Sequence, residues 1–189
     1  MKKRGIPLLL TIVLTLGLTA PAGAADTAGV AEPSLLLSVS EGQKAAEKLH
    51  TLGLFQGVGT NAEGTPDFDL DRTPTLIEGV TMLVRLMGKE QNAKWSTAET
   101  PFTNVPNWGL PYVRYSYGNG YTKGTSGTTF GSTAVLDAAQ YLTLLLRAMG
   151  YEDGTDFQWD SLWTLSNQPG FTDYDPAHPG AFTRGTAAV

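Results

Sequence analysis

A run of acidic residues in the first half of the chain has a spacing that could bind a cation. Asp67, Asp69 and Asp71 alternate with apolar residues, and Glu78 is the twelfth residue counted from Asp67. A calcium loop of the EF-hand type has oxygen ligands at this spacing, but it needs glycine at its sixth position. Arg72 occupies that position. The pattern therefore favours an acidic loop that caps a following helix, with Glu78 as the acidic member of a capping box, and we expect no metal site.

Residues that carry enzyme chemistry are few. The chain has no cysteine, and its two histidines, His50 and His178, do not have the spacing of a zinc site. It also contains no Gly-x-Ser-x-Gly nucleophile motif. The paired carboxylates of a glycosidase have no recognisable spacing, so that alternative stays open. Because the acidic residues cluster in expected loops, where solvation explains them, the sequence predicts a non-catalytic protein without a cofactor.

Tryptophans and cationic side chains are the alternatives for ligand binding. A tryptophan can stack on a sugar ring, and the chain has Trp95, Trp108, Trp159 and Trp163. Trp108 and Trp163 fall in expected helix starts or faces, where a place in the core is the simpler interpretation, whereas Trp159 lies among aspartates and should be exposed. The cationic candidates for holding an anion are Arg72, Arg85, Arg114, Lys123, Arg147 and Arg184.

The N-terminus has the features of an export signal. Lys2, Lys3 and Arg4 precede an apolar stretch, residues 6–18, and the small residues Ala22-Gly23-Ala24 follow it. We expect cleavage after Ala24, which gives a signal peptide of residues 1–24 and a secreted chain with no later run long enough to span a membrane. Removing three cations takes the net charge of −5 to −8, which argues against nucleic acid and anionic lipid as partners.

The rest of the chain shows an internal repeat of about 62 residues. Two apolar helices are expected, from Thr75 to Met87 and from Ala134 to Met149, and Met82–Gly88 aligns without a gap over Leu144–Gly150. A shorter helix is expected before each, and a third unit starts near Leu162. The predicted segments are a flexible leader (25–39), a first unit (40–88), a linker (89–101), a second unit (102–150) and a partial third unit (151–189).

These two units resemble the S-layer homology repeats of bacterial surface proteins. No single motif is specific, but the ordered set occurs twice. In the first unit the similar residues are Leu52–Gly57, Phe68, Glu78 and Arg85–Gly88, and in the second they are Phe102–Trp108, Gly120–Gly124, Phe130 and Arg147–Gly150. The resemblance implies a mostly α fold in which tandem helix-loop-helix repeats pack around a shared core, with the third repeat incomplete.

The same resemblance implies a location at the cell surface and a partner in the wall, either peptidoglycan or a polysaccharide linked to it. In the family, a Thr-Arg-Ala-Glu segment opens the second helix, and its arginine commonly contacts the anionic polysaccharide. Leu76 and Ala138 stand at that place in the first two units, so only Thr183-Arg184 keeps the arginine.

The candidate ligand-binding residues are therefore Arg184, Thr183, Trp108 and Glu78. The leading hypothesis is a non-catalytic anchor that binds wall polysaccharide weakly. The alternative is a structural or protein-interaction scaffold whose glycan site has decayed. For Arg184 itself, we expect either a local contact with ligand, whose loss would leave the fold unchanged, or a place on a frayed C-terminus.

Overall fold

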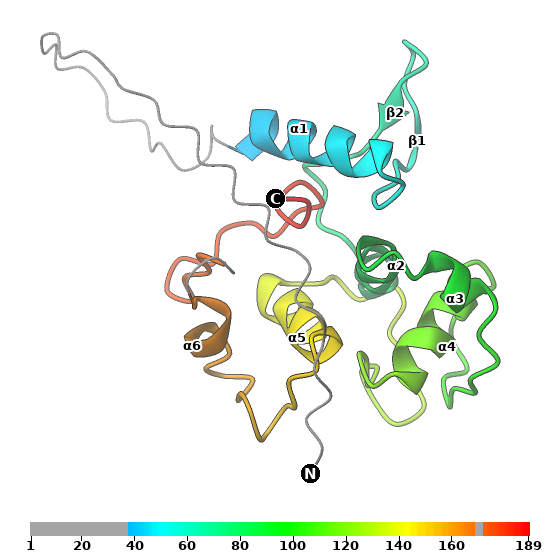
Figure 1. Ribbon diagram of the computed structural model, residues 1–189, viewed down its shortest axis with the longest axis vertical. Helices are drawn as coiled ribbons and strands as arrows, with labels where there is room; N and C mark the ends of the chain where they lie inside the picture. Colours follow the sequence, from blue (N-terminus) through cyan, green and yellow to red (C-terminus); the bar gives the residue numbers. More distant parts are fainter. Residues whose placement is uncertain (1–37, 169–171) are drawn as a thin grey trace, which may run out of the picture. The chain divides into compact units, whose positions relative to one another are not determined.

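The computed structural model describes residues 38–168 and 172–189 (Figure 1). The chain divides into two units, Met1–Glu32 and Pro33–Val189, and every described residue belongs to the second. The expected signal peptide and nearly all of the expected leader lie outside the described residues. The described elements are α1 (Ser38–Thr51), β1 (Gly59–Thr60), β2 (Pro66–Asp67), α2 (Leu76–Leu86), α3 (Glu90–Lys94), α4 (Leu110–Gly118), α5 (Ala138–Ala148) and α6 (Trp163–Ser166).

This part of the chain is mostly helical, as the sequence predicts. Two short strands, β1 and β2, form one antiparallel hairpin in which Gly59 pairs with Asp67. None of the helices in the described ranges is long and apolar enough to cross a membrane.

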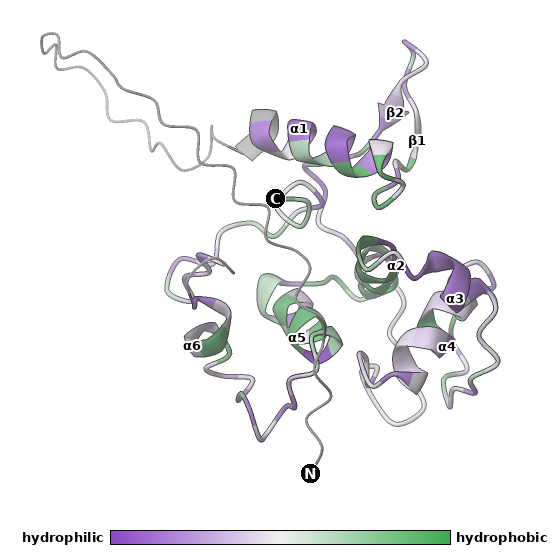
Figure 2. Ribbon diagram, in the orientation of Figure 1, coloured by the Kyte–Doolittle hydropathy of each residue, from purple (hydrophilic) through white to green (hydrophobic). Residues whose placement is uncertain are grey.

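Helix α2 forms where its apolar periodicity predicts it. Thr75 and Glu78 close the predicted capping box at its start. Val80 and Leu83 lie on its buried face, and Figure 2 shows the helix as largely hydrophobic. The helix ends before Gly88, whose φ of 65° is a conformation that residues with a Cβ rarely adopt.

Helix α5 begins at Ala138, four residues later than the predicted start at Ala134. The difference arises because the residues before it pair with another segment: Val135 forms an antiparallel bridge with Thr75. Asp137 then caps the helix by accepting a hydrogen bond from the amide of the third helical residue, at 2.7 Å. Apolar periodicity alone did not show that a backbone pairing ends where the helix starts.

Similar backbone contacts join the start of α2 to two distant segments. The amide of Leu76 donates to the carbonyl of Ala134 at 2.8 Å. The amide of Arg184, near the C-terminus, donates to the carbonyl of Arg72 at 2.9 Å. The region around the start of α2 therefore contacts two other segments, one about 60 and the other about 110 residues later in the chain.

The main apolar core lies between α2, α4 and α5. Its buried members are Ile77, Val80, Leu83, Val84, Ala93, Phe102, Tyr112, Val113, Phe130, Leu136, Tyr141 and Leu144. Leu83 is fully buried, whereas Leu145, its counterpart in the aligned segment of the second helix, is only half-buried. Helix α3 is a second difference, because it lies inside the segment predicted to be a linker.

Candidate functional site

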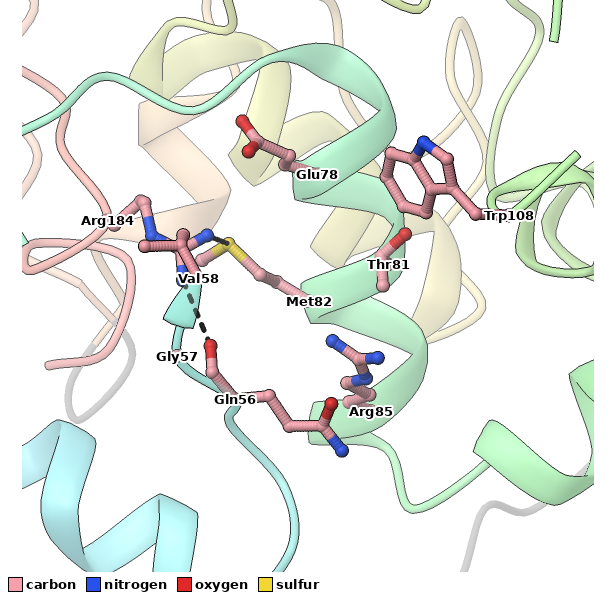
Figure 3. Close-up of a pocket in the computed structure, with 9 residues that line it drawn as sticks. All are labelled: Gln56, Gly57, Val58, Glu78, Thr81, Met82, Arg85, Trp108 and Arg184. Carbon is pink, nitrogen blue, oxygen red and sulfur yellow. Dashed lines mark hydrogen bonds between the residues drawn. The ribbon is translucent and has the colours of Figure 1, made fainter. Parts of the chain in front are cut away.

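One pocket brings together three of the four predicted ligand-binding residues (Figure 3). It has a volume of about 310 Å³ and lies between the loop after α1, helix α2, the turn before α4 and the C-terminal segment. Its lining residues are Gln56, Gly57, Val58, Glu78, Thr81, Met82, Arg85, Trp108 and Arg184. Glu78, Trp108 and Arg184, which are far apart in the sequence, therefore share one site.

Arg184 is a buried residue of this pocket, with 4% of its surface exposed. Its Nε donates to the carbonyl of Phe68 at 2.8 Å, and its Nη2 donates to the carbonyl of Gln56 at 3.0 Å. Nη1 lies 3.8 Å from the sulfur of Met82, and the guanidinium carbon lies 5.2 Å from the centre of the Phe55 ring. The expectation that Arg184 lies on a frayed C-terminus is wrong, because these contacts hold it inside the fold.

No carboxylate contacts Arg184 directly, although the charges of Glu78 and Asp69 are near enough to favour its charged form. No ion pair within 4.0 Å joins it to any aspartate or glutamate in residues 38–168 and 172–189. Burial lowers the pKa of Arg184 because it removes water from the charged form. A buried cation whose direct contacts are all with neutral groups is unusual.

Glu78 faces the same pocket, but its charge is already neutralised. Both of its oxygens accept hydrogen bonds from Arg72, at 2.8 and 2.9 Å, and the amide of Thr75 donates to it at 2.8 Å. The contact with Arg72 is the main reason that the pKa of Glu78 falls to about 2. Glu78 therefore acts first as a helix cap and ion-pair partner, as the capping-box interpretation predicts.

Arg85 is the second cation that lines the pocket. Its Nη2 lies 3.3 Å from a carboxylate oxygen of Glu90 and 3.2 Å from the hydroxyl of Tyr112. Its guanidinium also lies over the Tyr112 ring, at 5.4 Å. Because Glu90 pairs with Arg85, this arginine contributes less free positive charge to the pocket than Arg184 does.

The rim of the pocket carries two exposed apolar side chains. Trp108 is 55% exposed and Val58 is 50% exposed. The interpretation of Trp108 as a core residue is therefore wrong, and its indole ring is open to a ligand at the pocket (Figure 3). Trp159, which the sequence predicts to be exposed, is also 55% exposed.

Thr183 does not line the pocket. Its amide donates to the hydroxyl of Thr186 at 2.8 Å, and its own hydroxyl accepts from the amide of Thr186 at 3.2 Å. These reciprocal bonds close the turn that contains Arg184.

The acidic loop contacts the start of α2 through the capping pair Thr75 and Glu78. Within the described residues, no group of three or more histidine, cysteine or acidic side chains is placed to hold a metal ion. Asp69 pairs with Arg72, the residue at the position where an EF-hand loop needs glycine. The observed contacts therefore agree with the interpretation of this segment as an acidic loop that caps α2.

Several lining residues were not predicted from the sequence. Gln56 and Gly57 belong to the repeat motif Leu52–Gly57 of the first unit, so their position near a ligand could have been inferred from it. Thr81 and Met82 show no comparable signal, because both are buried and look in the sequence like ordinary packed residues of α2.

Comparison with known proteins gives three bacterial surface proteins, whereas no family model matches the chain. A "Surface layer protein" of Brevibacillus choshinensis is 32% identical over 119 residues, which cover 62% of this chain and 10% of that protein. A "Middle cell wall protein" of Brevibacillus brevis is 29% identical over 119 residues, covering 62% and 11%. A "Cell surface protein" of Thermoanaerobacter kivui is 30% identical over 112 residues, covering 58% and 14%.

These similarities confirm the predicted resemblance to bacterial surface proteins and the predicted location at the cell surface or wall. The chain spans 10–14% of the length of these relatives, so they share only one segment with it. None of these three proteins is named as an enzyme.

Proposed function

We propose that this chain is a non-catalytic module that attaches to the cell wall by binding an anionic polysaccharide linked to peptidoglycan. The observation that carries the proposal is the buried guanidinium of Arg184, which has no carboxylate partner among the described residues and lines a pocket beside an exposed tryptophan. A carboxylate or phosphate of a sugar unit would balance this charge, and the indole of Trp108 would contact the face of the sugar ring.

The net charge of the chain makes this local cation important. The net charge of −5 becomes −8 once the three cations of the expected signal peptide are removed, so the chain repels an anionic polymer at long range, although salt screens this repulsion beyond about 10 Å. Attraction must therefore come from the pocket itself. Binding should be weak and sensitive to ionic strength, because a single uncompensated guanidinium provides most of the attraction.

The proposal includes a fold of repeated units around a shared core. The alignment of Met82–Gly88 with Leu144–Gly150 supports it, since these segments form the ends of α2 and α5. The capped helix starts at Thr75 and Asp137 also correspond, because each lies seven residues before the aligned segment. The capped turn at Thr183 is the matching start of a third unit.

A pull-down with purified sacculi tests this function. We expect the chain to bind sacculi that carry their polysaccharide, to be released as salt is raised, and not to bind sacculi from which the polysaccharide has been stripped. Tight, salt-insensitive retention on stripped sacculi would contradict the proposal.

A structural or protein-interaction scaffold is the second candidate. Arg184 already donates to two backbone carbonyls, so its burial has a structural use without any ligand. Leu76 and Ala138 also offer no charge at the corresponding helix starts. If the chain fails to bind sacculi at low salt, the scaffold becomes the better description.

A further inference from the structure

A cluster of charged side chains joins α2, α3 and α4 next to the pocket. One carboxylate oxygen of Glu90, Oε1, accepts a hydrogen bond from the hydroxyl of Tyr112 at 2.5 Å. The same oxygen lies 3.3 Å from Nη2 of Arg85 and 3.3 Å from Nζ of Lys94. Two cations therefore share a single negative charge, and neither of them is fully neutralised.

Arg85 connects this cluster to the pocket. It is one of the lining residues, whereas Glu90, Lys94 and Tyr112 are not (Figure 3). Glu90 contacts one edge of the guanidinium, at 3.4 Å from Nε and 3.3 Å from Nη2. In the described part of the chain, Nη1 of Arg85 forms no hydrogen bond. This nitrogen can donate to a ligand while the other edge stays paired.

The burial of the cluster lets its charges act on the pocket. The side chains of Arg85 and Glu90 are each 20% exposed, and that of Lys94 is 50% exposed. Water and salt screen partly buried charges less than exposed ones. A change of charge at Glu90 should therefore alter the attraction of the pocket for an anion, and a change at Lys94 should do so more weakly.

The same arrangement recurs in the second unit. Arg147 takes the place of Arg85 in the aligned segment, and its Nη2 lies 2.7 Å from Oδ2 of Asp153. Nζ of Lys123 lies 3.3 Å from that same oxygen. A helix supplies the acidic residue in the first unit and a loop supplies it in the second. The shared oxygen is therefore not a by-product of the local shape of α3.

We propose that Glu90 and Lys94 are positioning residues that set, through Arg85, how strongly the pocket attracts an anion. Glu90 lowers the attraction because it neutralises part of the charge of Arg85. Lys94 restores part of it because it competes for the same oxygen. The inference rests on the proposed function, since the anion is the acidic group of the wall polysaccharide. It extends that function to two residues that do not line the pocket.

Opposite charge changes at one oxygen test this inference in the full chain. The measurement is calorimetry with short acidic polysaccharide fragments released from sacculi. Glu90→Gln keeps an oxygen that can accept from Tyr112 but removes the negative charge, and it should bind the fragments roughly 2- to 5-fold more tightly at low salt. Lys94→Gln should bind them more weakly than the natural chain. Both differences should shrink as salt is raised.

Three controls separate charge from contact. Glu99→Gln and Lys44→Gln make the same charge changes at exposed residues that do not line the pocket, and should leave the affinity unchanged. Glu90→Asp keeps the charge on a shorter side chain, and should bind fragments as the natural chain does. If Glu90 serves only to join the three helices, Glu90→Gln will melt at a lower temperature without binding more tightly. That result would overturn the inference.

Two other outcomes are also decided by these variants. If Glu90→Gln does not fold, Lys94→Gln decides alone, because a half-exposed lysine can be replaced without loss of the core, and unchanged affinity would overturn the inference. If the natural chain binds no fragment, the proposed function fails. Inorganic phosphate then tests the inference by itself: it should raise the melting temperature of Glu90→Gln more than that of Glu99→Gln, and equal shifts would overturn it.

Discussion

Replacing Arg184 with alanine should destabilise the fold, in contrast to the expectation from the sequence that only a local ligand contact would be lost. The substitution removes two charge-assisted hydrogen bonds to the carbonyls of Phe68 and Gln56. Such bonds contribute about 1.5–3 kcal/mol each, but removing a buried, unpaired cation also recovers part of its desolvation cost. We expect a net loss of about 2–4 kcal/mol in the free energy of unfolding.

Thermal and urea unfolding followed by circular dichroism would measure this loss. For a unit of this size, the melting temperature should fall by roughly 5–15 °C. Arg114→Ala is the matched control, because it removes the same side chain from an exposed position on α4 and should change stability by less than about 0.5 kcal/mol. Equal melting temperatures for the two variants would refute the claim that Arg184 joins the C-terminal segment to the first unit.

Two further predictions concern helices α2 and α5. Because the pKa of Glu78 is lowered to about 2, its contribution to stability should be complete above about pH 5 and should disappear as the pH falls towards 2. Acid titration of unfolding should therefore be flatter over this range in Glu78→Gln than in the exposed control Glu63→Gln; equal slopes would contradict the ion-pair assignment. Leu83→Ala should cost about 2–5 kcal/mol in chemical unfolding, whereas Leu145→Ala, at a half-buried site, should cost less. A larger loss in Leu145→Ala than in Leu83→Ala would show that Leu145, and not Leu83, is the more deeply buried side chain.

The sequence predicted the helices well where local signals agreed. The apolar stripe of α2, the cap at Thr75 and the glycine after the helix all indicate the same boundaries, and the structure has them. The start of α5 could not be predicted in this way, because Ala134 and Val135 belong to a contact with a segment about 60 residues earlier. Long-range backbone pairing leaves no periodic signal of its own.

The sequence named three residues that the structure brings together at one pocket, but it did not predict their contacts. Resemblance to known repeats indicated Arg184, Trp108 and Glu78, and the structure places all three at one pocket. It did not indicate that Glu78 would be neutralised by Arg72, or that Arg184 would be buried among backbone carbonyls. Both depend on contacts between residues whose distance in space cannot be read from their spacing in the sequence.

Because Arg184 has a structural role, its loss cannot by itself distinguish polysaccharide binding from folding. Trp108 separates the two, since it lines the same pocket but is 55% exposed. Trp108→Ala should leave the melting temperature nearly unchanged while polysaccharide affinity falls roughly 2- to 12-fold, the range expected from about 0.5–1.5 kcal/mol of aromatic contact. Trp95→Ala is the control, because Trp95 is 81% exposed and does not line the pocket. Equal affinity in the two tryptophan variants would show that the sugar does not contact this rim, and would favour the scaffold over the anchor.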